Sequence, residues 1–114
     1  MAKTNRSESI CKMIRGDVDA MKTGLFSDNP YYRMDALIWL SYHNLSVPEL
    51  IDRIKQLKSD TAVLMGYTIS NYAIAALSAL NVERYNGTDA IQQELNAHIV
   101  PTKEQAQAFL AKYE

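Results

Sequence analysis

The chain has 114 residues, 47% of them hydrophobic, and twelve basic and thirteen acidic residues leave a net charge of -1. This length suits one domain with a single core, so we expect one helical domain over residues 1–114. The charge lacks the basic excess that binding to nucleic-acid phosphates usually requires, which disfavours a duplex-binding protein. The basic residues gather near the start, and residues 34–114 hold six basic and nine acidic residues.

Cysteine content and hydropathy bear on the compartment. Cys11 is the only cysteine, so no disulfide within the chain is possible and nothing indicates an oxidising environment. No stretch approaches the roughly 20 apolar residues of a membrane span, and the first twenty residues lack the apolar run of a signal peptide. We therefore expect a cytoplasmic protein without membrane contact, in which residues 1–6 are disordered.

Apolar residues recur at helical spacing through the chain, and no alternation of period two indicates a strand. The first apolar stripe consists of Ile10, Ile14, Val18, Met21 and Leu25. These steps of three and four predict one helix of about four turns, which Gly24 ends.

The next two helices have clear start signals. Asp28 or Asn29 is the expected cap of the second helix, with Pro30 in its first turn. In the third, Ser46 and Glu49 have the spacing of a capping box.

A fourth helix is predicted from about Thr61 to Val82, capped by Ser59 or Asp60, with Gly66 as a bend or a break near its start. Its expected buried face comprises Val63, Ile69, Ala73, Ala76 and Leu80. The short side chains of the stretch NYAIAALSAL, at 71–80, allow a neighbouring helix to approach closely, so we expect a central packing helix.

Two shorter helices complete the chain. Thr88 is the expected cap of the first, which carries Ile91 and Leu95, and Thr102 and Gln105 have capping-box spacing at the start of the second. About six helices joined by short connections predict an all-α domain of antiparallel pairs.

Two segments share a short motif. Leu25–Asp28 and Leu57–Asp60 both read L-x-S-D, and each precedes a helix rich in Ala or Leu. This pattern resembles the HEAT-like family of helical repeats over about residues 8–82. Asp28 and Arg33 match the family's turn Asp and following Arg, whereas Asp60 has no Arg after it. The resemblance implies a right-handed stack of helix pairs that binds another macromolecule; a compact helical bundle is the alternative.

Residues able to perform chemistry are scattered. His43 and His98 stand far apart without further ligands at metal spacing, and the glycines form no phosphate-binding loop. Glu49, Asp52 and His43 are the residues that a hydrolase or an enzyme's accessory subunit would use, and Cys11 with His43 is a further conceivable pair. Solvated ion pairs and an inert thiol explain these residues more simply, so we predict no catalytic residue, metal or cofactor.

Seven tyrosines are the less ordinary feature of the composition. Tyr and Arg are enriched at protein interfaces. We therefore predict a partner-binding surface made of Tyr31, Tyr32, Arg33, Asp35, Tyr67 and Asn71. An equally good reading is that several of the tyrosines edge the core with their hydroxyl groups in water.

Together these features favour a non-catalytic protein–protein interaction module, such as an inhibitor of the bacterial immunity type that masks its partner. The mildly acidic larger part of the chain suits a partner with a basic surface. A small helical hydrolase or accessory subunit is the alternative, and a weak nucleic-acid binder that uses the basic start of the chain is the second alternative.

Overall fold

The computed structural model describes residues 5–114, and within this range it contains seven α-helices and two very short strands. The elements are α1 (Asn5–Ile14), α2 (Val18–Leu25), α3 (Pro30–His43), α4 (Pro48–Leu57), β1 (Val63–Leu64), β2 (Tyr67–Thr68), α5 (Ile69–Ala79), α6 (Ala90–His98) and α7 (Lys103–Tyr113). The expected helical class is therefore confirmed in outline, with a small hairpin that the sequence did not predict.

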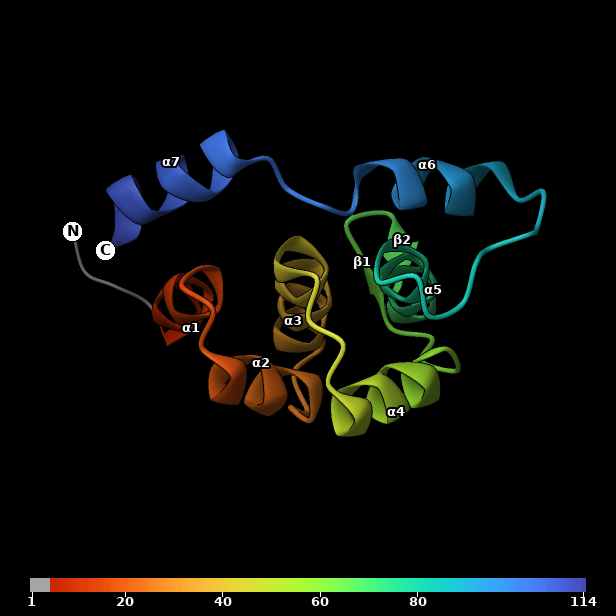
Figure 1. Cartoon of the computed structure of the whole chain (residues 1–114), viewed down its shortest axis with the longest axis horizontal. Coiled ribbons are helices and arrows are strands. Elements are labelled where there is room, and N and C mark those ends of the chain that lie inside the picture. Colours follow the sequence, from red (N-terminus) through yellow and green to blue (C-terminus); the bar gives the residue numbers. More distant parts are fainter. Residues whose placement is uncertain (1–4) are drawn as a thin grey trace.

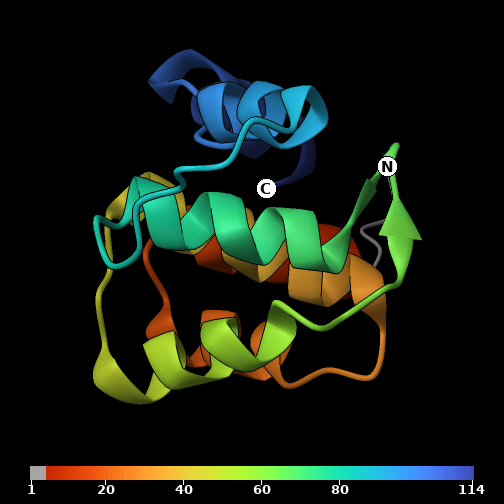
Figure 2. The ribbon, with the colours of Figure 1, turned by 90° about the vertical axis from the view of Figure 1, so that its right-hand side faces the viewer.

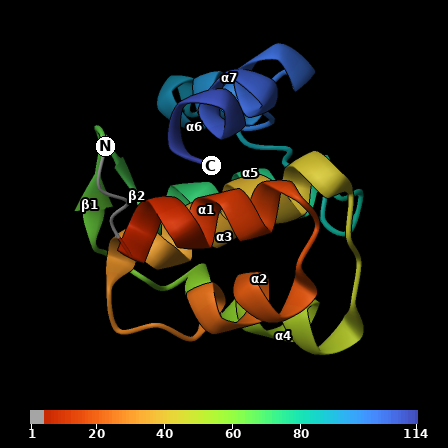
Figure 3. The ribbon, with the colours of Figure 1, turned by 90° about the vertical axis from the view of Figure 1, so that its left-hand side faces the viewer.

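The helices form three layers (Figure 1). Helices α1, α3 and α5 lie side by side in a central row, which Figure 1 shows end-on. Helices α2 and α4 lie on one side of the row, where they contact α3 and α5, and α6 and α7 lie on the other side, against α5 and α1. The side views show that α6 and α7 form a separate layer above the row (Figures 2 and 3). The core therefore centres on the middle row.

The predicted first helix is two helices, because the chain turns at Gly16. Gly16 has a φ of 87°, in the left-handed region that ends helices, and Asp17 then caps α2 by accepting a hydrogen bond from the backbone of Ala20. Gly24 does not end this helix but lies inside α2. Val18, expected in the buried stripe, is 38% exposed. The chain thus breaks and changes direction at Gly16, where one continuous helix was predicted.

The predicted helix from Thr61 to Val82 is shorter than expected, because a hairpin occupies its first part. Thr68 caps α5 in a reciprocal capping box with Asn71. Val63 lies in β1 and is largely exposed, so it does not share the buried face of α5 as expected. Asp60 accepts a hydrogen bond in the turn before the hairpin and does not cap this helix.

The predicted caps have mixed outcomes. Asn29 caps α3 and Thr102 caps α7 as expected, the latter in a capping box with Gln105. The capping box predicted at Ser46 is wrong, since Val47 is the N-cap residue of α4 and makes no side-chain bond.

Helix α6 also begins one residue later than predicted. Asp89, not Thr88, is its cap, and its carboxylate accepts hydrogen bonds from two backbone nitrogens of the first turn. Its Leu95 is buried as expected, whereas Ile91 is exposed.

The alanines of α5 lie at the centre of the fold. Ala73, Ala75 and Ala76 have no exposed surface, and α5 contacts α3, α4 and α6. Side chains this short let three neighbours pack around one helix, which is the central role predicted for it.

Two remaining expectations concern the ends of the chain and the membrane. Asn5 and Arg6, expected to be disordered, form the start of α1, and residues 1–4 lie outside the described part. Among residues 5–114, no helix combines the length and the apolar character of a membrane span.

Candidate interaction surface

A β-hairpin projects at the end of the row where α1, α3 and α5 begin (Figure 3). Leu64 pairs with Tyr67, which leaves Met65 and Gly66 as the two residues of the turn. Their φ values are 56° and 86°. Positive φ at both central residues is the signature of a type I′ turn, for which Asn-Gly is the preferred sequence.

Met65 is the unusual residue of this turn. Among residues 5–114, the other non-glycine residues with positive φ are Asn44 and Asn81, and asparagine tolerates this region best. Met65 is 76% exposed and Val63 is 67% exposed. The hairpin therefore presents two apolar side chains to solvent, one of them on a strained backbone.

Arg6 joins α1 to α3 at the same end of the row. It donates two hydrogen bonds to the Asp35 carboxylate, each over 2.8 Å, and its guanidinium carbon lies 4.8 Å from the centre of the Tyr31 ring. The Asp35 side chain is only 4% exposed. Burial raises the pKa of this carboxyl group, although Arg6 acts against the shift. Asp35 is thus an internal partner of Arg6.

Arg33 is also held inside the fold. Its Nε donates a hydrogen bond to Asp60 over 2.9 Å, and a terminal nitrogen donates to the backbone oxygen of Ser27. Its side chain is 12% exposed. These contacts link two turns and leave little of the guanidinium on the surface.

Tyr67 and Asn71 both connect to α6. The Tyr67 hydroxyl donates a hydrogen bond to Glu94 over 2.7 Å, and this bond raises the pKa of the tyrosine. Asn71, besides its part in the capping box, donates to the side-chain oxygen of Gln92, also over 2.7 Å. Asn71 therefore fixes α6 on α5, while the half-buried Tyr67 borders the surface.

The six residues predicted for the interface thus fall into two groups. Asp35, Arg33 and Asn71 have their polar groups bonded within the fold. The three tyrosines Tyr31, Tyr32 and Tyr67 are half-buried or exposed. Arg6 contacts both Tyr31 and Asp35, and the interface role of the tyrosines stays a prediction.

A hollow of 380 Å³ lies beside the base of the hairpin. It is bordered by Ile38, Tyr67, Tyr72, Glu94, Leu95, His98 and Ile99. The two tyrosine rings meet edge to face, with centroids 5.8 Å apart, and the Tyr72 hydroxyl donates to the backbone oxygen of Leu64. Apolar walls with one carboxylate and one imidazole at the border are typical of a binding site.

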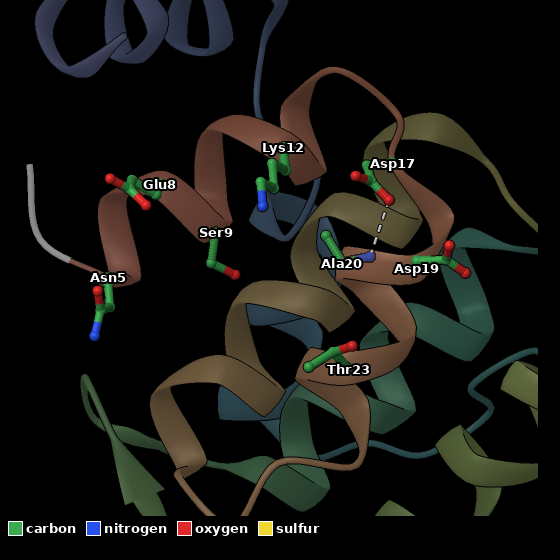
Figure 4. A pocket seen from close by; sticks show the side chains of 8 residues that line it. All are labelled: Asn5, Glu8, Ser9, Lys12, Asp17, Asp19, Ala20 and Thr23. Atoms are coloured by element: carbon green, nitrogen blue, oxygen red, sulfur yellow. Dashed lines mark hydrogen bonds between the residues drawn. The ribbon is translucent and has the colours of Figure 1, made fainter.

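A second hollow, of 330 Å³, lies between α1 and α2, and most of the residues that line it are of polar types. In Figure 4 the carboxylates of Glu8 and Asp19 stand on opposite sides of it, and Asp17 is engaged by the backbone of Ala20. The acidic groups do not converge on one point. Among residues 5–114 there is no cluster of three His, Cys, Asp or Glu placed to hold a metal ion.

The residues named for a hydrolase lie on three helices, with Cys11 on α1, His43 on α3, and Glu49 and Asp52 on α4. Nε2 of His43 bonds to a backbone carbonyl oxygen of α1 over 2.7 Å, so this nitrogen carries a proton and is not a free base. Cys11 is buried in α1. Glu49 forms an exposed ion pair with Lys22 over 3.3 Å, and Asp52 is exposed on α4. The absence of catalytic residues stays a prediction.

The nucleic-acid alternative depended on basic residues near the start of the chain. Two of them, Arg6 and Arg15, form ion pairs with Asp35 and Glu114. Both guanidinium groups therefore bind carboxylates of the same chain, and nucleic-acid binding stays a prediction.

Sequence reasoning missed Met65, Val63 and Glu94. A signal for the first two was present, because Gly66 follows Met65 between two short runs with strand-forming residues, as in a two-residue hairpin. The helical period of the flanking segments hid it. Nothing in the sequence indicated that Glu94 lies against Tyr67.

No family model, no curated protein and no solved structure matches the chain. Any function must therefore be inferred from the geometry described above.

Proposed function

We propose that this protein is a non-catalytic module that binds another protein through the hairpin end of its fold. The observation that carries the proposal is Met65, which is 76% exposed at a backbone position with positive φ. Such a conformation costs a bulky residue about 1 kcal/mol or more. Because the side chain is so exposed, it gains little from packing in the fold, and a contact with a partner accounts for its presence.

The rest of this end suits the same role. Val63 and Tyr31 are also exposed, and Tyr31 lies against the guanidinium of Arg6. Large apolar and aromatic side chains on rigid supports are the usual anchors of protein interfaces. The hairpin is braced from behind by the hydrogen bond from Tyr72 to Leu64, so these side chains need little ordering on binding.

We further propose that the pairs α2–α3 and α4–α5 are two units of a HEAT-like stack. The L-x-S-D turns precede α3 and follow α4, and Arg33 after the first turn binds Asp60 of the second. A small helical stack of this kind suits an inhibitor that masks its partner, as immunity-type proteins do. The excess of acidic residues after residue 33 favours a partner with a basic surface.

Affinity capture from a native lysate of the source organism, read out by mass spectrometry, tests this proposal. We expect wild type to recover one stoichiometric protein partner, and Met65→Asn to lose it. Val18→Asn is the matched control, because Val18 is an exposed apolar residue on α2, in the layer opposite α6. Equal recovery by Met65→Asn and wild type would contradict the proposal.

A further inference from the structure

The hollow beside the hairpin combines a carboxylate, two aromatic rings and apolar walls. We propose that it binds an arginine side chain of the partner protein. This inference rests on the proposed function, since the arginine belongs to the protein that the hairpin end binds. It adds the chemistry of the contact, in which Met65 is the apolar anchor and the neighbouring hollow binds a cation.

The carboxylate of Glu94 supplies the charge. Its Oε1 accepts a hydrogen bond from the Tyr67 hydroxyl over 2.7 Å, which holds the group at the border of the hollow. A carboxylate accepts several hydrogen bonds, so one from tyrosine leaves capacity for a guanidinium. His98 is nearby, but its Nδ1 is engaged by the backbone oxygen of Glu94 over 2.8 Å.

The aromatic and apolar walls explain why arginine is preferred. Tyr67 and Tyr72 meet at 79°, and both border the hollow. A planar guanidinium stacks on aromatic rings and is less strongly hydrated than an ammonium group. The three-carbon stem of arginine is apolar and suits the aliphatic walls, which are formed by Ile38, Leu95 and Ile99.

The same arrangement of groups already occurs once within this chain. Arg6 binds the Asp35 carboxylate through two hydrogen bonds and stacks on Tyr31. In the hollow, Glu94 and Tyr67 repeat the acid and the aromatic ring, while the arginine is missing from the lining. Charge complementarity therefore indicates a guanidinium supplied from outside.

The test is a titration of the isotope-labelled protein with Nα-acetylarginine methylamide, followed by NMR chemical shifts. We expect saturable shifts at Ile38, Leu95 and Tyr67, with weak affinity in the millimolar range for so small a probe. Nα-acetylcitrulline methylamide, which has nearly the same shape without the charge, should bind on the order of tenfold more weakly. Glu94→Gln should lose a similar factor for the arginine probe.

Glu94→Gln keeps an acceptor for the Tyr67 hydroxyl, so the hollow should retain its shape, which the unperturbed spectrum will verify. Glu104→Gln, which removes an exposed carboxylate of α7, is the matched control and should bind like wild type. Equal binding of citrulline, equal binding by Glu94→Gln, or shifts away from the hollow would overturn the inference. The NMR titration contains no partner protein, so its failure would not decide the proposed function. The capture experiment with Met65→Asn tests that function separately.

Discussion

Arg33 on α3 and Asp60 after α4 are joined by a hydrogen-bonded ion pair of 2.9 Å. Arg33 also binds the backbone of Ser27 in the turn before α3, and Asp60 accepts a hydrogen bond from the backbone nitrogen of Ala62. One guanidinium therefore ties the turn of the α2–α3 pair to the turn of the α4–α5 pair, where each partner is less than one-fifth exposed.

Arg33→Ala should lower the free energy of unfolding by about 2 to 3 kcal/mol, because it leaves the shielded Asp60 carboxylate without its cation. Urea unfolding followed by circular dichroism measures this loss. Lys22→Ala, which breaks the exposed pair with Glu49, is the control and should cost less than about 1 kcal/mol. Equal losses of unfolding free energy in the two variants would show that the Arg33 contact stabilises the fold no more than an exposed ion pair does.

Gly24→Ala should also destabilise the protein, although alanine is normally the better helix residue by about 1 kcal/mol. An added Cβ would lie 2.8 Å from the Met13 side chain, 2.9 Å from the backbone oxygen of Tyr32 and 3.0 Å from the Cβ of Ala36. The backbone oxygen cannot move aside without shifting α3, so we expect a loss of about 1 to 3 kcal/mol.

The control for Gly24 is its neighbour in α2, Thr23, which is exposed. Thermal unfolding of Thr23→Ala should differ little from that of wild type. A Gly24→Ala variant that melts at a higher temperature than wild type would mean that α2 and α3 are less tightly packed than described.

Asp35 gives a prediction about pH. Burial raises the pKa of its carboxyl group in the folded protein. Its favourable contribution to stability is therefore complete below the pKa of the unfolded chain, and it is lost as the pH rises through the higher, folded pKa. Relative to Asp35→Asn, wild type should gain stability as the pH is lowered from about 7 to about 4.

The measurement is the free energy of unfolding of both proteins in urea at several pH values. The asparagine variant cannot titrate at this position, so the difference between the two curves isolates Asp35 from pairs such as Lys58 and Glu83, where the pKa of the carboxyl is lowered. A difference that is constant with pH, or that slopes the other way, would refute the prediction.

Local signals predicted much of the fold. The caps at Asn29 and Thr102 are correct because a side chain three or fewer residues from its target needs no tertiary information. The central position of α5 follows from its alanines. The apolar pattern showed no sign of the break at Gly16, because the apolar spacing continues across it. Ile14 and Met21 pack into the same core from two different helices.

The candidate site was harder to predict, for a physical reason. Tyr67 was singled out by composition, but its partner Glu94 is distant in sequence and becomes its neighbour only when α6 folds over α5. Arg33 and Asp35 were predicted as interface residues from their residue types. In the structure Arg33 binds Asp60 and Asp35 binds Arg6. A pairing of charges across helices depends on tertiary structure, which residue types alone do not show.

The hairpin escaped prediction for a different reason. Each strand has only two residues, too few to display a period of two, and Met65 is by type a good helix former. The strain at Met65 is a property of its backbone conformation, which the amino-acid composition does not reveal.

We propose that Met65 stands at the hairpin tip for binding and contributes nothing to folding. The decisive measurement compares Met65→Asn with wild type twice, for thermal unfolding and for recovery of the partner. Because Asn-Gly is the preferred type I′ turn, we expect a melting temperature equal to or above that of wild type together with loss of the partner. A lower melting temperature with the partner still bound would contradict it.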